Sequence, residues 1–212
     1  MSSAVVFVHP CAESFTAAVL ERVVRGLESA GSTVETIDLY ADGYHPGTDL
    51  PQRHREVLDH ASTLVLVYPT WWTTQPAILL GWLTAAMVEG AASIATLVCV
   101  TTHGGPRLGN LIAGQSGRHT AARVVRSRCA RGALFHWVAL YGLDKGDEQR
   151  RLAFLARVER ELGRLARRDW PRQPSPGDSV ETARSFPRSR PGPTRERADS
   201  STDAMPSEEN AT

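Results

Sequence analysis

The sequence is poor in cysteine and has no long apolar run. Its 212 residues include three cysteines, Cys11, Cys99 and Cys129, which have no metal-ligand spacing. Two of them lie inside apolar segments, where a reduced thiol packs as a small hydrophobic side chain. No stretch reaches the roughly 18 uninterrupted apolar residues of a membrane helix, and no basic region precedes an apolar run at the N-terminus. We therefore expect a cytoplasmic protein without an integral membrane segment.

Net charge is also small, at +1 by formal count. Such a chain lacks the acidity of small electron carriers and the overall positive excess that is typical of nucleic-acid-binding proteins. Its length allows one compact core and is short for two domains. We expect one domain over residues 1–169.

The composition changes after Trp170. Residues 171–212 hold seven of the thirteen prolines, are rich in Ser, Arg and Glu, and contain almost no large apolar side chain. Such a segment cannot bury enough apolar surface to offset the entropy lost on ordering. We expect residues 170–212 to form a disordered tail.

The remaining residues alternate between two hydrophobic patterns. Short apolar runs predict strands at 4–8, 34–39, 64–68, 94–100 and 134–140. Helical spacing and start signals predict helices from Phe15 to a stop at Gly31, and over 76–88, 117–129 and 147–168. Strands that alternate with helices indicate an α/β fold with a parallel, doubly wound sheet.

The first strand runs into a segment suited to phosphate. It leads through His9 and Pro10 to Ser14, where a helix begins with Phe15 and Thr16. A helix N-terminus presents unpaired N–H groups and a positive dipole end, and both favour an anion. The alternative is an ordinary strand-to-helix turn in which Ser14 only caps the helix.

The third and fourth strands also end in distinctive segments, and ligands of such sheets bind at these strand ends. Gly104 and Gly105 allow a planar ring close to the main chain, where N–H groups meet the edge of a reduced isoalloxazine that collects negative charge. Trp71 and Trp72 could shield the ring, and His103 could add a hydrogen bond or a positive charge. Each feature alone is more typical of packing or of a turn, but together they predict a flavin site.

A longer set of residues carries a family resemblance. Its members are His9, Ser14, Phe15, Asp38, Leu39, Tyr40, Pro46, Pro69, Trp71, Trp72, Pro76, Ala77, Leu79, Gly81, Trp82, Thr101, Thr102, Gly104 and Gly105. With these residues the chain resembles the flavodoxin-like NAD(P)H:quinone reductase family over about residues 4–165. The resemblance implies a flavodoxin-like sheet of five strands in the order 2-1-3-4-5 with helices on both faces. It also implies bound FMN or FAD, ping-pong hydride transfer from NAD(P)H to a quinone-like acceptor, and a homodimer.

The resemblance assigns flavin contacts to particular residues. The expected contacts are His9, Ser14, Phe15, Thr16, Pro69, Thr70, Trp71, Trp72, Thr101, Thr102, His103, Gly104 and Gly105. We expect Trp72 and His103 to be the catalytic residues. His103 is an insertion in the usual Thr-Thr-Gly-Gly spacing, and Asn110 and Ser116 stand where a Tyr and a His of the family are expected. His103 or Arg107 is the substitute that we expect for this missing pair.

No acidic residue lies between Glu89 and Asp144, although the span contains six arginines. An uncompensated positive surface attracts an anionic dinucleotide, and arginine matches phosphate geometry. We expect Arg107 and Arg118 to hold NADPH or the pyrophosphate of FAD. A solvated helix face explains the later arginines equally well.

Two alternatives use the same fold. A flavin-binding accessory subunit of a membrane transporter or other complex would share the predicted site, and it would place a membrane partner at the surface of the protein. A phosphatase would need Arg six residues after Cys11, where Ala17 stands, so that alternative is excluded.

Overall fold

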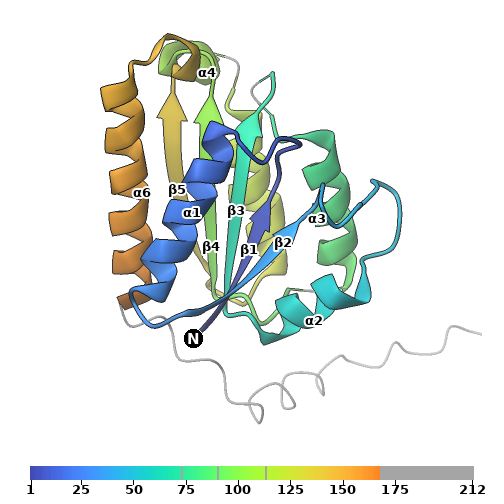
Figure 1. Ribbon diagram of the computed structural model, residues 1–212. Coiled ribbons are helices and arrows are strands. Elements are labelled where there is room, and N and C mark those ends of the chain that lie inside the picture. Colours follow the sequence, from blue (N-terminus) through green and yellow to red (C-terminus); the bar gives the residue numbers. More distant parts are fainter. Residues whose placement is uncertain (73, 90, 113, 168–212) are drawn as a thin grey trace, which may run out of the picture. The chain divides into compact units, whose positions relative to one another are not determined.

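The computed structural model describes residues 1–167 apart from residues 73, 90 and 113. The tail expected at 170–212 lies outside the described residues. The five strands are β1 Ser2–Phe7, β2 Thr33–Asp38, β3 Thr63–Thr70, β4 Thr96–His103 and β5 Leu134–Tyr141. All pairings are parallel, and the strand order is β2-β1-β3-β4-β5 (Figure 1). The fold predicted from the sequence is therefore confirmed.

Helices cover both faces of this sheet. They are α1 Phe15–Glu28, α2 Gln52–His60, α3 Ala77–Glu89, α4 Arg107–Ile112, α5 Ser116–His119, the π-helix η1 Thr120–Val125, the short 3₁₀-helices η2 Arg126–Arg128 and η3 Leu143–Lys145, and α6 Glu148–Arg167. One core packs α1 and α6 against one face of the sheet, and the other packs α2, α3 and η1 against the opposite face. In Figure 1, α1 crosses in front of the strands and α6 stands at the left of the picture.

The central strands are long apolar runs because both of their faces are covered. Every residue of β4 is buried, as are the first six residues of β3. Cys99 of β4 and Cys129 lie in the same core, and burial raises their thiol pKa values to about 12 and about 11, respectively. Both thiols are therefore uncharged packing groups, as their apolar surroundings in the sequence predict.

Three helical segments differ from the sequence prediction. Helix α2 was not predicted because its nine residues are mostly polar, and only its inner side is buried, at His54, Val57 and Leu58. Helix α4 is too short to show a period, and it includes Gly109. The segment expected as one helix at 117–129 is helical over 116–128, but its type changes from α5 to the π-helix η1 and then to the 3₁₀-helix η2. The Gly117 carbonyl of this segment accepts a hydrogen bond from the Gln75 side chain.

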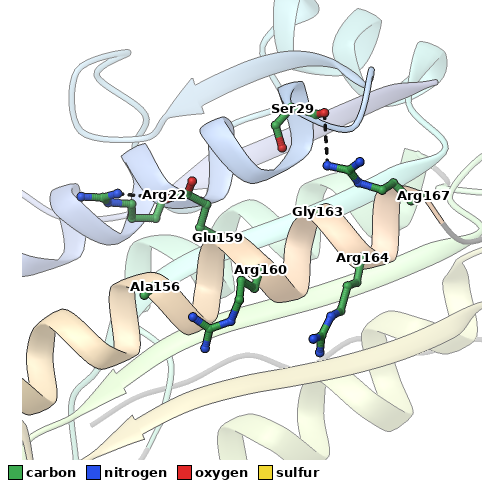
Figure 2. Close-up of a pocket in the computed structure, with 8 residues that line it drawn as sticks. All are labelled: Arg22, Ser29, Ala156, Glu159, Arg160, Gly163, Arg164 and Arg167. Atoms are coloured by element: carbon green, nitrogen blue, oxygen red, sulfur yellow. Dashed lines mark hydrogen bonds and ion pairs between the residues drawn. The ribbon is translucent and has the colours of Figure 1, made fainter.

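Helices α1 and α6 approach closely because a glycine of each lies at the contact. A Cβ atom on Gly26 would lie 2.6 Å from the Glu159 carbonyl oxygen, and one on Gly163 would lie 3.3 Å from the Gly26 carbonyl oxygen. Beside this contact, Arg22 pairs with the Glu159 carboxylate at 2.9 Å (Figure 2). Backbone-to-backbone packing therefore sets the spacing of this helical layer.

We expect Gly26→Ala to destabilise the fold by about 1–3 kcal/mol, because the added methyl group meets a backbone oxygen that cannot turn away. This cost opposes the gain of about 1 kcal/mol that alanine normally brings to a helix interior. The matched control is Gly109→Ala in α4, where the nearest atom would lie 3.8 Å away and only the gain should remain. Urea unfolding of both variants measures the difference, and equal effects would contradict the packing argument.

Candidate functional site

The carboxyl ends of β1, β3 and β4 lie side by side at one edge of the sheet. This is the upper edge in Figure 1, where α1 begins and α4 lies. Thr70 and His103, the last residues of β3 and β4, are register partners, and the Thr70 hydroxyl donates to the Thr102 carbonyl at 2.9 Å. The structure thus gathers the three predicted segments at one edge.

The start of α1 has the features of an anion-binding site, which we call the anion seat. Ser14 is the N-cap, and its hydroxyl oxygen accepts the N–H of Ala17 at 3.1 Å. The N–H groups of Phe15 and Thr16 precede the first intrahelical bonds and so have no acceptor within the helix. His9 lies in the loop before the cap, with its ring Nδ1 3.0 Å from the Cys11 backbone nitrogen. Main-chain donors and the dipole of a 14-residue helix therefore face this loop.

Two side chains of this turn contribute to packing. The Phe15 ring lies 6.5 Å from the Phe154 ring of α6, and Thr16 is only 4% exposed. Their expected contact with a phosphate would therefore come from their N–H groups.

The segment after β3 exposes both predicted tryptophans. Trp71 is 48% exposed and Trp72 is 96% exposed. Trp71 exchanges two backbone hydrogen bonds of 3.1 Å with Thr74, and Trp72 has a positive φ of 51°. A bulky residue with positive φ is an unusual, strained feature that clusters at functional sites. Pro69 and Thr70 are half-buried members of β3.

Gln75 holds this segment to the next one, a role that the sequence analysis missed. Its side chain is 2% exposed, and its amide donates to the Gly117 carbonyl at 2.8 Å. No local pattern marks this contact, because it joins residues 42 positions apart.

Gly104 and Gly105 present main chain at the end of β4. A Cβ atom on Gly105 would have the Asn110 side chain as its nearest neighbour, at 3.8 Å, so one side of this residue is open. From the other side, the Gly105 carbonyl accepts the N–H of Gly142 at 2.8 Å. Thr101 and Thr102 are 1% and 2% exposed, so their expected ligand contacts would involve main-chain atoms.

The segment after β5 packs against Gly104, since the Asp144 carboxylate lies where a Gly104 side chain would extend. Asp144 follows the last strand, and this position past a strand end is the sequence feature that could have predicted its place beside the site.

His103 is buried at this edge, with 4% exposure. Asn110 donates its amide to the Pro106 carbonyl at 3.1 Å, so its amide oxygen faces His103 Nδ1 at 2.8 Å and accepts that N–H. The His103 ring stacks on Tyr141 with 4.4 Å between centroids. Burial lowers the pKa of His103, and the hydrogen bond with Asn110 opposes this shift. The imidazole is therefore neutral at pH 7, and the positive charge expected from it is disfavoured.

Gly81 and Trp82, two of the residues that carry the family resemblance, contribute to packing. A Cβ atom on Gly81 of α3 would lie 2.7 Å from Pro46 Cβ, so the glycine lets the loop after β2 pack against the helix. The Trp82 indole N–H donates to His54 Nδ1 at 3.2 Å, and His54 Nε2 lies 3.0 Å from the Asp42 carboxylate. These residues therefore shape the flank of the site from within the core.

The two predicted dinucleotide arginines lie together. Arg107 and Arg118 line one cavity of about 330 Å³, and Arg157 of α6, which the sequence analysis missed, joins them. Within the described ranges, no cluster of metal-ligating side chains occurs, and no helix has the length and apolar character needed to cross a membrane.

Comparisons with known proteins agree with this fold. A family model described as a flavodoxin-like fold matches residues 1–123. An uncharacterized NAD(P)H oxidoreductase of Haemophilus influenzae is 31% identical, and the match covers 43% of this chain and 53% of that protein. A second uncharacterized NAD(P)H oxidoreductase, from Escherichia coli, is 27% identical over a similar share. The chain thus spans about half the length of the curated relatives that it matches.

Solved structures share the fold over most of their length. An NAD(P)H:quinone oxidoreductase from Methanothermobacter marburgensis superposes with a TM-score of 0.66 at 25% identity, covering 78% of this chain and 96% of that one. An FMN-dependent NADH-azoreductase from Bacillus anthracis, solved with FMN, gives a TM-score of 0.58 at 15% identity, covering 78% of this chain and all of that one. The latter likeness concerns the fold alone.

We expect Asn110→Asp to raise the pKa of His103, because a carboxylate at the same place stabilises the imidazolium form. NMR titration of the His103 ring should show a pKa below the ordinary 6.5 in the parent protein and a higher value in the variant. A depressed pKa also means that this histidine reduces stability as the pH falls through 6.5, and the variant should lose less stability over that interval. A parent pKa at or above 6.5 would contradict the assignment.

Proposed function

The chain belongs to the flavodoxin-like fold family, and we propose that it is a flavin-dependent NAD(P)H oxidoreductase that reduces a quinone or a similar acceptor. One observation carries the proposal: the anion seat at α1, the exposed tryptophans and the open main chain of Gly105 lie at the same edge of the sheet. The names of the relatives support the same activity.

The residues at this edge fit a flavin. The N–H groups of Phe15 and Thr16 suit its phosphate, and the open side of Gly105 suits the approach of a flat ring. Trp71 and Trp72 would border that ring, because large exposed aromatic side chains beside a site commonly cover a ligand. Either FMN or FAD meets these criteria, and FMN is the cofactor bound in the azoreductase neighbour.

When bound, the flavin supplies the hydride chemistry, accepting two electrons from NAD(P)H and passing them to the acceptor. The protein holds the reactants in place and stabilises negative charge. That charge would meet backbone N–H groups at Gly104 and Gly105, since His103 is neutral and its Nδ1–H is bound to Asn110. We propose that NAD(P)H and the acceptor use one slot beside the tryptophans in turn, which makes the reaction ping-pong.

The support behind Gly105 gives this arrangement its rigidity. Gly142 and Asn110 both donate to the Gly105 carbonyl, at 2.8 Å and 3.5 Å. These bonds hold the Gly105–Pro106 peptide, which has no N–H of its own, and so restrain Gly105, whose own N–H is one of the two proposed donors. Donors that are already oriented need no rearrangement as charge develops, and this is why they are effective in catalysis.

We expect Gly105→Val to weaken FMN binding by about tenfold or more while the apoprotein keeps its stability, because the added Cβ atom meets no atom closer than 3.8 Å and the side chain extends into the open side. Quenching of flavin fluorescence gives Kd, and Gly109→Ala is the control. Equal affinity in parent and variant would remove Gly105 from the site.

The activity test is anaerobic spectroscopy of the flavin-loaded protein. NADPH should bleach the oxidised flavin band, and a quinone should restore it. A protein that binds flavin but is not reduced by NADPH or NADH would contradict the proposed enzyme and favour the accessory-subunit alternative. Mass spectrometry of the released cofactor separates FMN from FAD.

The homodimer expected from the resemblance has a candidate surface on α3 and η1. Helix α3 carries no charged residue before Glu89, and a helix that is apolar all round is normally covered on all sides. Its outer residue Val88 is 79% exposed, and Val124 of η1 is 59% exposed. Both line one apolar hollow of about 240 Å³. We propose that a second copy of the chain covers this surface.

We expect Val124→Asp to convert a dimer into a monomer, because a charge at the centre of an apolar interface is desolvated without a partner. Light scattering after size-exclusion chromatography measures the mass. Leu152→Asp, at an exposed position of α6, is the control and should leave the dimer intact. A monomeric parent protein would contradict the proposal.

A further inference from the structure

A cavity of about 330 Å³ opens at the free edge of β5. Its walls come from three parts of the chain that are distant in sequence. Arg107 and Arg118 lie on the segments after β4, Trp137 and Tyr141 lie on β5, and Arg157 lies on α6. The fold thus assembles three guanidinium groups and two aromatic rings around one hollow.

The charge in this cavity is largely uncompensated. None of its lining residues is acidic. Arg157 donates its Nε–H to the Glu161 carboxylate at 2.7 Å, and this bond leaves its terminal N–H groups available. Arg118 has a 3.5 Å contact with the neutral side chain of Gln115. Among the described residues, Arg107 has no ion pair. Arg107 and Arg118 therefore have no carboxylate partner among the described residues, and such guanidinium groups suit a phosphate monoester, which they bind through paired N–H donors.

The aromatic walls suit a purine. Trp137 and Tyr141 are four residues apart on β5, so their side chains lie on the same face of the strand. The Trp137 indole N–H donates to the Tyr141 hydroxyl at 3.4 Å, and this bond orients both rings. Any nucleobase can stack on such rings, because every base has a π-face.

Tyr141 also joins the cavity to the proposed flavin edge. Its ring stacks on His103, and the next residue, Gly142, donates to the Gly105 carbonyl. We propose that this cavity binds the 2′-phosphoadenosine end of NADPH and makes the protein select NADPH over NADH, an inference that rests on the proposed function. Arginine is the residue type that accommodates the 2′-phosphate of this dinucleotide in other folds.

The groove between α1 and α6 is a useful contrast. It measures about 480 Å³, and it is lined by Arg22, Arg160, Arg164 and Arg167. Figure 2 shows Arg160 and Arg164 extending away from α1, while Arg22 is paired with Glu159. These guanidinium groups do not converge on one point, so Arg160 serves as the matched control for Arg157 on the same helix.

The test compares 2′,5′-ADP with 5′-ADP by calorimetry on the full chain, which needs no turnover. We expect 2′,5′-ADP to bind at least about tenfold more tightly, because only it carries the 2′-phosphate. Arg118→Ala and Arg157→Ala should each weaken the binding of 2′,5′-ADP about tenfold, and Arg160→Ala should leave it unchanged. Equal affinity for the two nucleotides, or an equal effect of Arg160→Ala and Arg157→Ala, would overturn the proposal.

Kinetics then separate this inference from the proposed activity. In the flavin-loaded protein, Arg118→Ala should raise KM for NADPH about tenfold and leave KM for NADH unchanged. Selective 2′,5′-ADP binding without hydride transfer would contradict the proposed function and support the nucleotide site. A single-stranded oligonucleotide that binds more tightly than 2′,5′-ADP and is lost in the same variants would overturn the assignment to a dinucleotide.

Discussion

The whole site depends on the parallel pairing of β1, β3 and β4. Parallel pairing forces each strand to return through a crossover, so the segments that leave all three strands start from the same edge. Their order also places α1 where its unpaired N–H groups face the loop after β1. The proposed site for a phosphate and a flat ring thus arises from connectivity, and the proposed role of its main-chain donors requires no charged side chain at its centre.

Much of this arrangement could be predicted from the sequence. The apolar runs of the central strands gave the parallel sheet, because a strand buried on both faces cannot alternate with polar residues. The strand-end residues His9, Trp72 and Gly105 could be grouped for the same reason: parallel strands end together. The ligand contacts of these residues stay predictions, and the tail expected at 170–212 lies outside the described residues.

The features that could not be predicted depend on contacts between residues that are distant in the sequence. Nothing local to Gln75, Asp144 or Arg157 shows that each lies beside a loop from another part of the chain. The protonation state of His103 follows from burial and from Asn110, neither of which the residue type reveals. Helix α2 escaped prediction because its apolar side is too narrow to produce a helical period.

The bond between Gln75 and Gly117 links the tryptophan segment to the beginning of the η1 region. A buried amide that loses its acceptor is costly, so the two segments must shift together or not at all. Gln75 lies three residues after Trp72, and Gly117 lies in α5, directly before the η1 segment that a second copy would cover in the proposed dimer. In the proposed dimer, ligand contact at Trp72 and association of the two copies would thus act on segments that a single side chain joins.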